Sequence, residues 1–318
     1  MNKFINLVIN EHIKIYSKKS IWVLFGVIFV IGILNAVIVN SVTKNDAQDQ
    51  WQQNAEIQIS SIKSDQSIDQ LPDNLKDTIN EQVAISQYRL DNNIPPQRSD
   101  SMWGFVQGSA AIIGLITMFV IVISASSVAS EFSKGTIKLL LIRPHNRSKI
   151  LLSKYLVSFI FALEMLLFLL VAYLIIGVIF FGADGSSLPY LSFQNGGIIE
   201  SSMFTHILTV YSFACVELLV MVSFAFMLSC LTRNSALAIG LSIFLMFVGV
   251  TLVQFLVAFD YEWAKYIVFA NMDLSVYFEG SPMIESMTLT FSIVVVAIYL
   301  LAFNVLSWLS FTKRDVLS

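Results

Sequence analysis

Residues 151–182 read LLSKYLVSFIFALEMLLFLLVAYLIIGVIFFG, and the charged residues in this stretch are Lys154 and Glu164. An α-helix needs about 20 mostly apolar residues to cross the hydrocarbon of a bilayer. The stretch therefore predicts a transmembrane helix, and it is long enough to tilt or to extend beyond the hydrocarbon. The same criterion finds five further stretches. We predict six transmembrane helices, at residues 21–40, 103–129, 151–182, 204–231, 236–258 and 287–310.

The composition of the whole chain also indicates a membrane protein. Of its 318 residues, 56% are hydrophobic and 13% are charged, and the formal net charge is −3. A soluble domain has about 25% charged residues, so the composition excludes an ordinary soluble enzyme and a disordered protein. The negative balance provides no basic surface for nucleic acid. We therefore expect an all-α polytopic membrane protein that has no nucleic-acid partner.

The positions of the basic residues predict how the six helices are oriented. With the N-terminus inside, 13 of the 19 Lys and Arg residues fall in cytoplasmic segments. Cytoplasmic loops of membrane proteins carry an excess of Lys and Arg. Both termini are therefore predicted to be cytoplasmic, as are a turn at residues 232–235 and a tail at residues 311–318.

Two segments before the second span are predicted to be helical. Residues 1–20 place apolar residues at close to helical spacing, which indicates an amphipathic helix in the inner membrane interface; a plain cytoplasmic lead-in is the alternative. Residues 41–102 carry five basic and ten acidic residues. Their apolar residues recur four apart on both sides of Leu71-Pro72-Asp73, which predicts an extracellular insert of two short amphipathic helices. The insert could capture substrate or could act as a cap that helps the protein to dimerise.

Two further segments are expected outside the membrane. Residues 183–203 are predicted to form a short extracellular loop. Residues 259–286 are too broken by charges to span the bilayer and too apolar for a free loop, so we expect a re-entrant or interfacial helical pair. Aromatic residues are typical of headgroup depth. Four of them are candidate residues of an external gate: Trp263, Tyr266, Phe269 and Tyr277.

The connection at residues 130–150 carries the most specific pattern in the sequence. Residues 131–150 read EFSKGTIKLLLIRPHNRSKI, which predicts a short amphipathic helix, a break at Pro and a basic lead into the third span. The positive-inside rule alone could explain the charges. The order of residue types, however, resembles the pattern E-[FY]-x-x-G-T-x-x-x-L-L-x-x-P-x-x-R of the membrane subunits of ABC-2-type transporters. The matching residues are Glu131, Phe132, Gly135, Thr136, Leu140, Leu141, Pro144 and Arg147.

This resemblance implies a permease subunit of an ATP-driven ABC exporter in the bacterial cytoplasmic membrane. The eight matching residues would form a coupling helix seated in a cleft of a separate ATP-binding subunit, and residues 1–20 would be a second contact. Residues 259–286 would be part of the external gate. Members of the family work as dimers, of two copies or of two related permeases, among membrane lipids. Permeases of this type export drugs, antimicrobial peptides, lipids or polysaccharide precursors. The extracellular insert and the acids within the spans, Glu164 and Glu217, favour an amphipathic cargo moved outward, such as an antimicrobial peptide or a drug.

Two kinds of chemistry are not expected in this chain. The sequence contains no G-x-x-x-x-G-K-[ST] motif, which cradles phosphates in P-loop ATPases. We therefore expect no enzyme activity and no bound cofactor, with ATP and Mg²⁺ held by the partner ATPase subunit. His12, His145 and His206 are scattered, without Cys or carboxylate at ligand spacing, so no metal site is expected.

Two carboxylic acids lie inside predicted spans. Glu164 and Glu217 are each 13 residues from the start of their span, or roughly 20 Å along the helix axis, which predicts positions near the midplane. The Lys and Arg count assigns every such base, Lys154 at the start of the third span included, to the segments outside the hydrocarbon. Each Glu could be protonated and hydrogen-bonded, could face a wet cavity, or could neutralise a cationic substrate. With Asn35 and Asn304, amides that could instead join helices by hydrogen bonds, they are the candidate residues of a translocation pathway.

Two other functions are compatible with the sequence. A gradient-driven secondary transporter or channel would use Glu164 and Glu217 as proton or ion sites and would need no ATPase. A membrane sensor or scaffold would use the insert at residues 41–102 as a receptor and would move no cargo. The docking pattern at residues 131–147 favours the exporter over both, because neither alternative needs a contact for an ATPase.

Overall fold

The computed structural model describes residues 3–43, 50–65, 73–133, 135, 146–182, 188–194, 196–279, 282–284 and 286–313. Within these residues, six helical segments are long and apolar enough to cross a membrane. They lie at the six places that the apolar stretches predict, so the prediction of a six-helix membrane protein is confirmed to this extent. The segments are Lys19–Val42, Met102–Ser133, Arg147–Phe181, Met203–Thr232, Ser235–Ala258 and Leu289–Thr312.

Five of these segments are single α-helices and one is interrupted. The interrupted segment begins with α5 (Met102–Gly108), passes through the 3-10 turn η3 (Ser109–Ile112) and continues as α6 (Ile113–Ser133). Helices are the expected form for such apolar stretches, because every backbone hydrogen bond is then made within the segment. The single helices are α2 (Lys19–Thr43), α8 (Arg147–Phe181), α9 (Met203–Thr232), α10 (Ser235–Ala258) and α12 (Leu289–Lys313).

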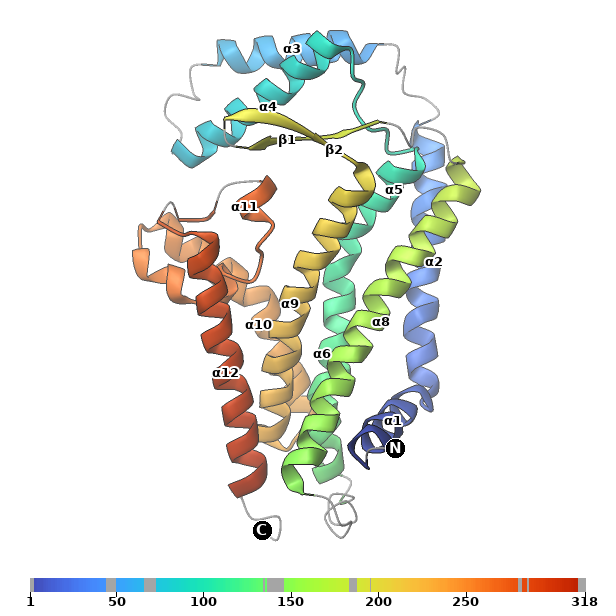
Figure 1. Ribbon diagram of the computed structural model, residues 1–318, viewed down its shortest axis with the longest axis vertical. Helices are drawn as coiled ribbons and strands as arrows, with labels where there is room; N and C mark the ends of the chain where they lie inside the picture. Colours follow the sequence, from blue (N-terminus) through green and yellow to red (C-terminus); the bar gives the residue numbers. More distant parts are fainter. Residues whose placement is uncertain are drawn as a thin grey trace.

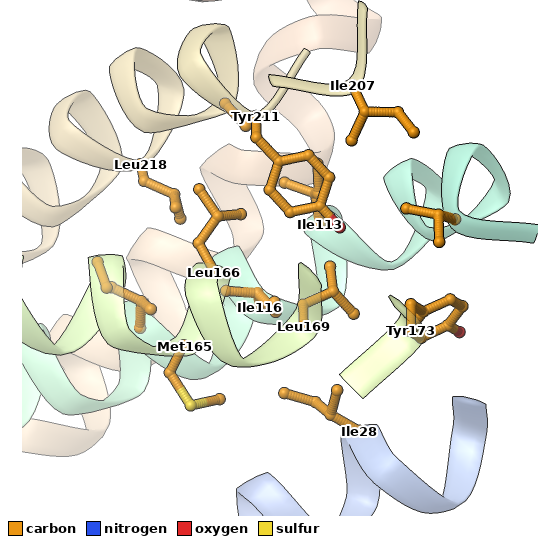
Figure 2. Packing of buried hydrophobic residues seen from close by; sticks show 14 of the residues in the cluster. Ile28, Ile113, Ile116, Met165, Leu166, Leu169, Tyr173, Ile207, Tyr211 and Leu218 are labelled. Atoms are coloured by element: carbon orange, nitrogen blue, oxygen red, sulfur yellow. The ribbon is translucent and has the colours of Figure 1, made fainter. Parts of the chain in front are cut away.

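The long helices run side by side along the long axis of the molecule (Figure 1). α6, α8 and α9 pack against one another, α2 packs on α8, and α10 and α12 pack on α9. A Cβ added at Gly32 of α2 would lie 2.8 Å from Cδ1 of Ile176, so this glycine lets α2 approach α8 closely. The largest apolar cluster lies between α2, α6, α8 and α9. Figure 2 labels ten of its side chains: Ile28, Ile113, Ile116, Met165, Leu166, Leu169, Tyr173, Ile207, Tyr211 and Leu218.

α1 (Lys3–Tyr16) packs on α8 at the end of the bundle where α12 also ends (Figure 1). The helical spacing of apolar residues within 1–20 predicts this helix. Leu7 is buried, whereas Ile5, Ile9 and Ile13 are between 43% and 59% exposed and recur every four residues. An exposed apolar stripe of this kind is typical of a helix that lies in the membrane interface.

The segment between α2 and α5 lies at the opposite end of the bundle (Figure 1). It contains α3 (Trp51–Ser64) and α4 (Asp73–Asn92), which pack on each other. The two helices predicted within residues 41–102 are therefore present. Of the predicted break between them, Leu71 and Pro72 lie outside the described residues.

A β-hairpin lies next to α4. The strands β1 (Tyr190–Gln194) and β2 (Gly197–Ser201) are antiparallel, and α4 packs against both. The predicted short loop at residues 183–203 therefore contains a hairpin that sequence reasoning did not expect, and the all-α fold class is corrected to a mostly helical fold with one small sheet. Five-residue strands give only a short alternating pattern, which is why sequence reasoning missed them. Gly196, with a φ of +80°, stands where the chain turns between the strands, as glycine readily does.

Residues 259–286 fold back against the bundle. They contain the 3-10 turns η4 (Glu262–Tyr266) and η5 (Val268–Ala270) and the short helix α11 (Val276–Glu279). Val268 and Met272 pack in one apolar cluster with residues of α6, α9, α10 and α12. The segment thus packs against the bundle, and it does so in single turns rather than as the predicted pair of helices.

Candidate functional site at the α1 end

Four charged side chains from three helices meet where α1 lies against α6 and α8. Nζ of Lys154, from α8, is 2.7 Å from Oε2 of Glu11 and 2.7 Å from Oε1 of Glu131. Lys14 pairs with Glu131 as well, and its Nζ is 3.6 Å from Oε1 of Glu11. Lys154 and Glu131 are only 3% and 4% exposed. We call these four residues the charged quartet.

Helix geometry places each member of the charged quartet. Glu11 and Lys14 are three residues apart and therefore lie on the same face of α1. Glu131 is two residues from the end of α6, and Lys154 is in the third turn of α8. Two ammonium groups and two carboxylates give the charged quartet a net charge of zero. This balance matters because a buried charge without a partner costs several kcal/mol. The quartet ties α1 to the two helices that flank residues 134–146.

The charged quartet shifts the pKa of both members on α1. Burial opposes the charged form of Glu11, but the charges and hydrogen bonds of Lys154 and Lys14 together outweigh burial and lower its pKa. Burial also opposes the charged form of Lys14, and the hydrogen bond to Glu131 with the charges of Glu11 and Glu131 outweighs it and raises the pKa. Both groups are therefore charged at neutral pH.

Glu164 of α8 provides a second polar contact to α1. Its Oε1 is 2.8 Å from Nε2 of His12, and its Oε2 accepts a hydrogen bond from the hydroxyl of Tyr16 at 2.5 Å. Burial and this hydrogen bond raise the pKa of Tyr16, so its hydroxyl remains a donor. Because Tyr16 precedes α2 by three residues, Glu164 lies beside the start of α2. The Lys and Arg count missed its partner because that count left out histidine.

Two of the proposed docking residues have side chains that contact this chain itself. Glu131 belongs to the charged quartet. Phe132 packs near Phe311 of α12, with ring centroids 6.5 Å apart, and the guanidinium of Arg233 lies 4.5 Å from the centre of its ring. These contacts account for an acidic and an aromatic residue at the end of α6 by packing within the bundle.

The remaining docking residues border the connection or lie outside the described residues. Gly135 has a φ of +68°, and its N–H donates to the carbonyl of Phe132 at 3.1 Å, an arrangement typical of glycine at the end of a helix. Arg147 is exposed at the first position of α8. The structure does not describe Thr136, Leu140, Leu141 and Pro144.

The other three candidate pathway residues stand on three different helices. Glu217, halfway along α9, interacts electrostatically with Asp273 in the segment before α11. Asn304 donates to a backbone carbonyl one turn earlier in α12, at 2.8 Å. Asn35 is half-buried on α2. Of the two acids, Glu164 holds α1, and Glu217 is half-buried halfway along α9.

The four candidate gate residues fall into two pairs. Trp263 and Tyr266 are 55% and 57% exposed. Phe269 packs so closely on Gly249 of α10 that a Cβ added there would lie 2.6 Å from its ring, and the hydroxyl of Tyr277 is 2.6 Å from Oγ of a serine in α12. The first pair is open to the surroundings, and the second pair fixes the segment to α10 and α12.

Sequence reasoning did not single out most of the residues that hold α1. Two signals could have found them. One is the opposite charge of Glu11 and Lys14 at a spacing of three on one face of a helix. The other is Lys154, which stands four residues inside an apolar stretch and therefore needs a partner. The overlooked residues are Glu11, His12, Lys14, Tyr16 and Lys154.

Comparisons with known proteins place the chain among membrane proteins. The model of a family described as "Protein of unknown function (DUF2705)" matches residues 76–317. The "Uncharacterized protein YhcI" of Bacillus subtilis (strain 168) is 39% identical over 314 residues, which are 98% of this chain and 99% of that one. The "Uncharacterized membrane protein YdbK" of the same organism is 31% identical over 214 residues, 67% of this chain and 82% of its own length. Six apolar helices and a membrane relative indicate a multi-pass membrane protein.

These comparisons correct the family assignment made from residues 131–147. The family model that matches is that of DUF2705, with no match to an ABC-2 family, so the assignment to the ABC-2-type permeases is wrong. The physical reason lies in two residues that face into the bundle. Glu131 and Phe132 fit the pattern, but ion pairing and ring packing inside the bundle favour the same residue types without any docked subunit.

Proposed function

Because the chain belongs to the DUF2705 family of proteins of unknown function, we propose a function from its own residues, as the membrane subunit of an exporter that a separate ATPase drives. In this proposal the ATPase docks at the end of the bundle that carries α1 and residues 134–146. ATP binding and hydrolysis in that partner tilt the spans. An amphipathic cargo, such as an antimicrobial peptide or a drug, then moves outward.

The charged quartet is the observation that supports this proposal most directly. It joins α1 to the end of α6 and to the first turns of α8, and both of these helices pack on α9. Breaking a buried ion pair is strongly unfavourable. A partner that pushes on α1 or on residues 134–146 would therefore move α6 and α8 as one body. A transporter driven from outside its membrane domain needs a rigid link of this kind.

Glu217 and Asp273 support a cationic or amphipathic cargo. Their carboxyl groups interact where the segment before α11 meets the middle of α9. Acidic side chains attract positive charge, and most of the residues of α9 around Glu217 are apolar.

Purification from native membranes in a mild detergent, followed by mass spectrometry, tests the proposal. We expect a P-loop ATPase in stoichiometric amount. Arg147→Glu reverses an exposed charge beside the proposed docking segment and should remove the ATPase while the chain remains folded. Lys63→Glu is the matched control, because Lys63 is exposed on α3 at the opposite end of the bundle, and it should keep the ATPase.

Two results would contradict the proposal. One is a preparation free of ATPase that still moves solute across liposomes. If such transport followed the proton gradient and were lost in Glu217→Gln, a gradient-driven transporter would replace the exporter. The other is retention of the ATPase in Arg147→Glu and its loss in Lys63→Glu, which would move the docking surface to the α3 end.

A further inference from the structure

A cavity opens beside the charged quartet, between α1, α6 and α8. The space open to the centres of water-sized molecules is about 40 Å³, and the total empty space, open mouth included, is about 400 Å³. Lys14 and Lys18 line it on the side of α1, Ser127 and Ser130 line it from α6, and Lys154 lines it from α8. The proposed docking of an ATPase makes no use of this space, so binding of a ligand in the cavity can be tested separately from that function.

The lining of the cavity suits an oxyanion. The ammonium groups of Lys14, Lys18 and Lys154 outnumber the carboxylates of Glu11 and Glu131, which line the same space. Oγ of Ser127 is buried and has no hydrogen-bond partner among the described residues. A buried hydroxyl without a partner is unfavourable, and a hydroxyl next to ammonium groups is a good donor to a negatively charged oxygen.

Two features beside the cavity are typical of segments at the depth of lipid headgroups. The exposed apolar stripe of α1, formed by Ile5, Ile9 and Ile13, is typical of a helix that dips into the boundary between headgroups and acyl chains. Trp22, at the start of α2, is 62% exposed, and its Nε1 donates to the carbonyl of Tyr16 at 3.1 Å. Tryptophan is enriched at the membrane–water interface. The headgroup phosphate of a lipid is therefore an oxyanion that is abundant at the mouth of the cavity.

We propose that this cavity binds the phosphate group of an anionic phospholipid of the leaflet in which α1 lies. Lys18 and Lys14 attract the headgroup at the mouth, and Ser127 donates to a phosphate oxygen within. The added negative charge lies close to the side chains that hold α1 against α6 and α8. Because Lys14 and Lys18 line the cavity on the side of α1 and Ser127 lines it from α6, a phosphate bound to all three bridges α1 to α6 and strengthens the attachment of α1. The position of α1 then depends on the lipid composition of the membrane.

Reconstitution of the full chain into nanodiscs tests this site. Nanodiscs of phosphatidylcholine alone are compared with nanodiscs that also contain phosphatidylglycerol, and native mass spectrometry counts the lipid that stays bound to the released protein. We expect selective retention of phosphatidylglycerol and a roughly fivefold loss of retention in Lys18→Gln, the effect of one basic residue near an anionic surface. Ser127→Ala should also reduce retention. Lys19→Gln is the matched control, because Lys19 is exposed next in sequence but does not line the cavity.

Three outcomes would overturn the proposal. Equal retention of the two lipids would show that no anionic headgroup is selected. Equal losses in Lys18→Gln and Lys19→Gln would show attraction to the basic surface in general. The third outcome is that inorganic phosphate, added to phosphatidylcholine nanodiscs, protects the amides of α1 from hydrogen exchange to the same extent as phosphatidylglycerol. The cavity would then be a site for small anions and not for a lipid.

Discussion

α1 and the segment from Glu262 to Glu279 are both short helical pieces packed on the same bundle, but different forces hold them. α1 is held by the charged quartet and by the contact of Glu164 with His12 and Tyr16. The buried hydrogen bonds that hold the other segment join neutral groups. Asn271 is fully buried and donates to the carbonyls of Lys265 and Ile267, both at 2.8 Å, and accepts from Ser292 at 2.7 Å.

This difference predicts two different sensitivities. Ion pairs at low exposure fail when one partner is removed, because the remaining charge is left buried. Neutral hydrogen bonds and close ring packing fail instead when the shape of the site changes. Substitutions of charge should therefore release α1, and substitutions of volume should release residues 262–279.

Lys154→Met should give the largest effect, because it leaves the carboxylate of Glu131 buried with one ammonium partner instead of two. We expect a loss of about 3–5 kcal/mol in the free energy of unfolding, measured by unfolding in mixed micelles with tryptophan fluorescence. The double variant Lys154→Met/Glu131→Leu should recover most of the loss, since Glu11 and Lys14 then balance each other.

Lys149→Met is the matched control for this change. Lys149 is exposed on the same helix, and exposed substitutions usually change stability by less than about 0.5 kcal/mol. A loss in Lys154→Met no larger than that in Lys149→Met would show that the charged quartet does not hold the α1 end together.

Gly249→Ala should have the next largest effect, and it acts on the other region. The new Cβ would lie 2.6 Å from the ring of Phe269, so the segment must shift, at a cost of about 1–3 kcal/mol. Faster hydrogen exchange over residues 262–279, with no change over α1, is the expected measurement. Combining it with Phe269→Leu should restore part of the protection.

Gly240→Ala controls for the loss of glycine on the same helix. A Cβ at Gly240 meets nothing within 4 Å, and alanine is a better helix former than glycine by up to about 1 kcal/mol. This variant should be as stable as the parent or more stable. If both alanine variants behaved alike, close packing of Phe269 would not be what fixes the segment.

The elements that sequence reasoning found are those set by patterns local in the chain. The apolar stretch at residues 151–182 suffices to predict α8, because a span is defined by its own length and hydropathy. The hairpin at residues 190–201 was missed because two strands of five residues carry too short a pattern. A helix was predicted within residues 1–20, and α1 covers most of that range.

The candidate site was not predictable in the same way, because its partners lie far apart in the chain. Glu11 and Lys154 are separated by 143 residues, and no local pattern pairs them. Sorting charges by side of the membrane treated Lys154 as a cytoplasmic charge and Glu131 as a docking residue. In the folded chain both side chains are buried, and they form an ion pair with each other.

The smallest expected difference between the two regions is in how their protection from hydrogen exchange depends on pH. It is small because it involves the more exposed half of the charged quartet. Glu11 has a lowered pKa, so its contribution is complete above its ordinary value of 4.5 and is lost as the pH falls through the lowered value. Lys14 has a raised pKa, so its contribution is complete below 10.5 and is lost as the pH rises through the raised value. Protection of α1 amides from hydrogen exchange, corrected for the intrinsic pH dependence of exchange, should therefore weaken at both extremes of pH, whereas Asn271 and Ser292 carry no charge to lose.

The variant Glu11→Gln should remove the part of the weakening at low pH that comes from the titration of Glu11. If protection of α1 weakened at low pH as much in that variant as in the parent, the weakening would belong to another carboxyl group of the α1 end. If protection of residues 262–279 weakened equally, charge would hold both regions.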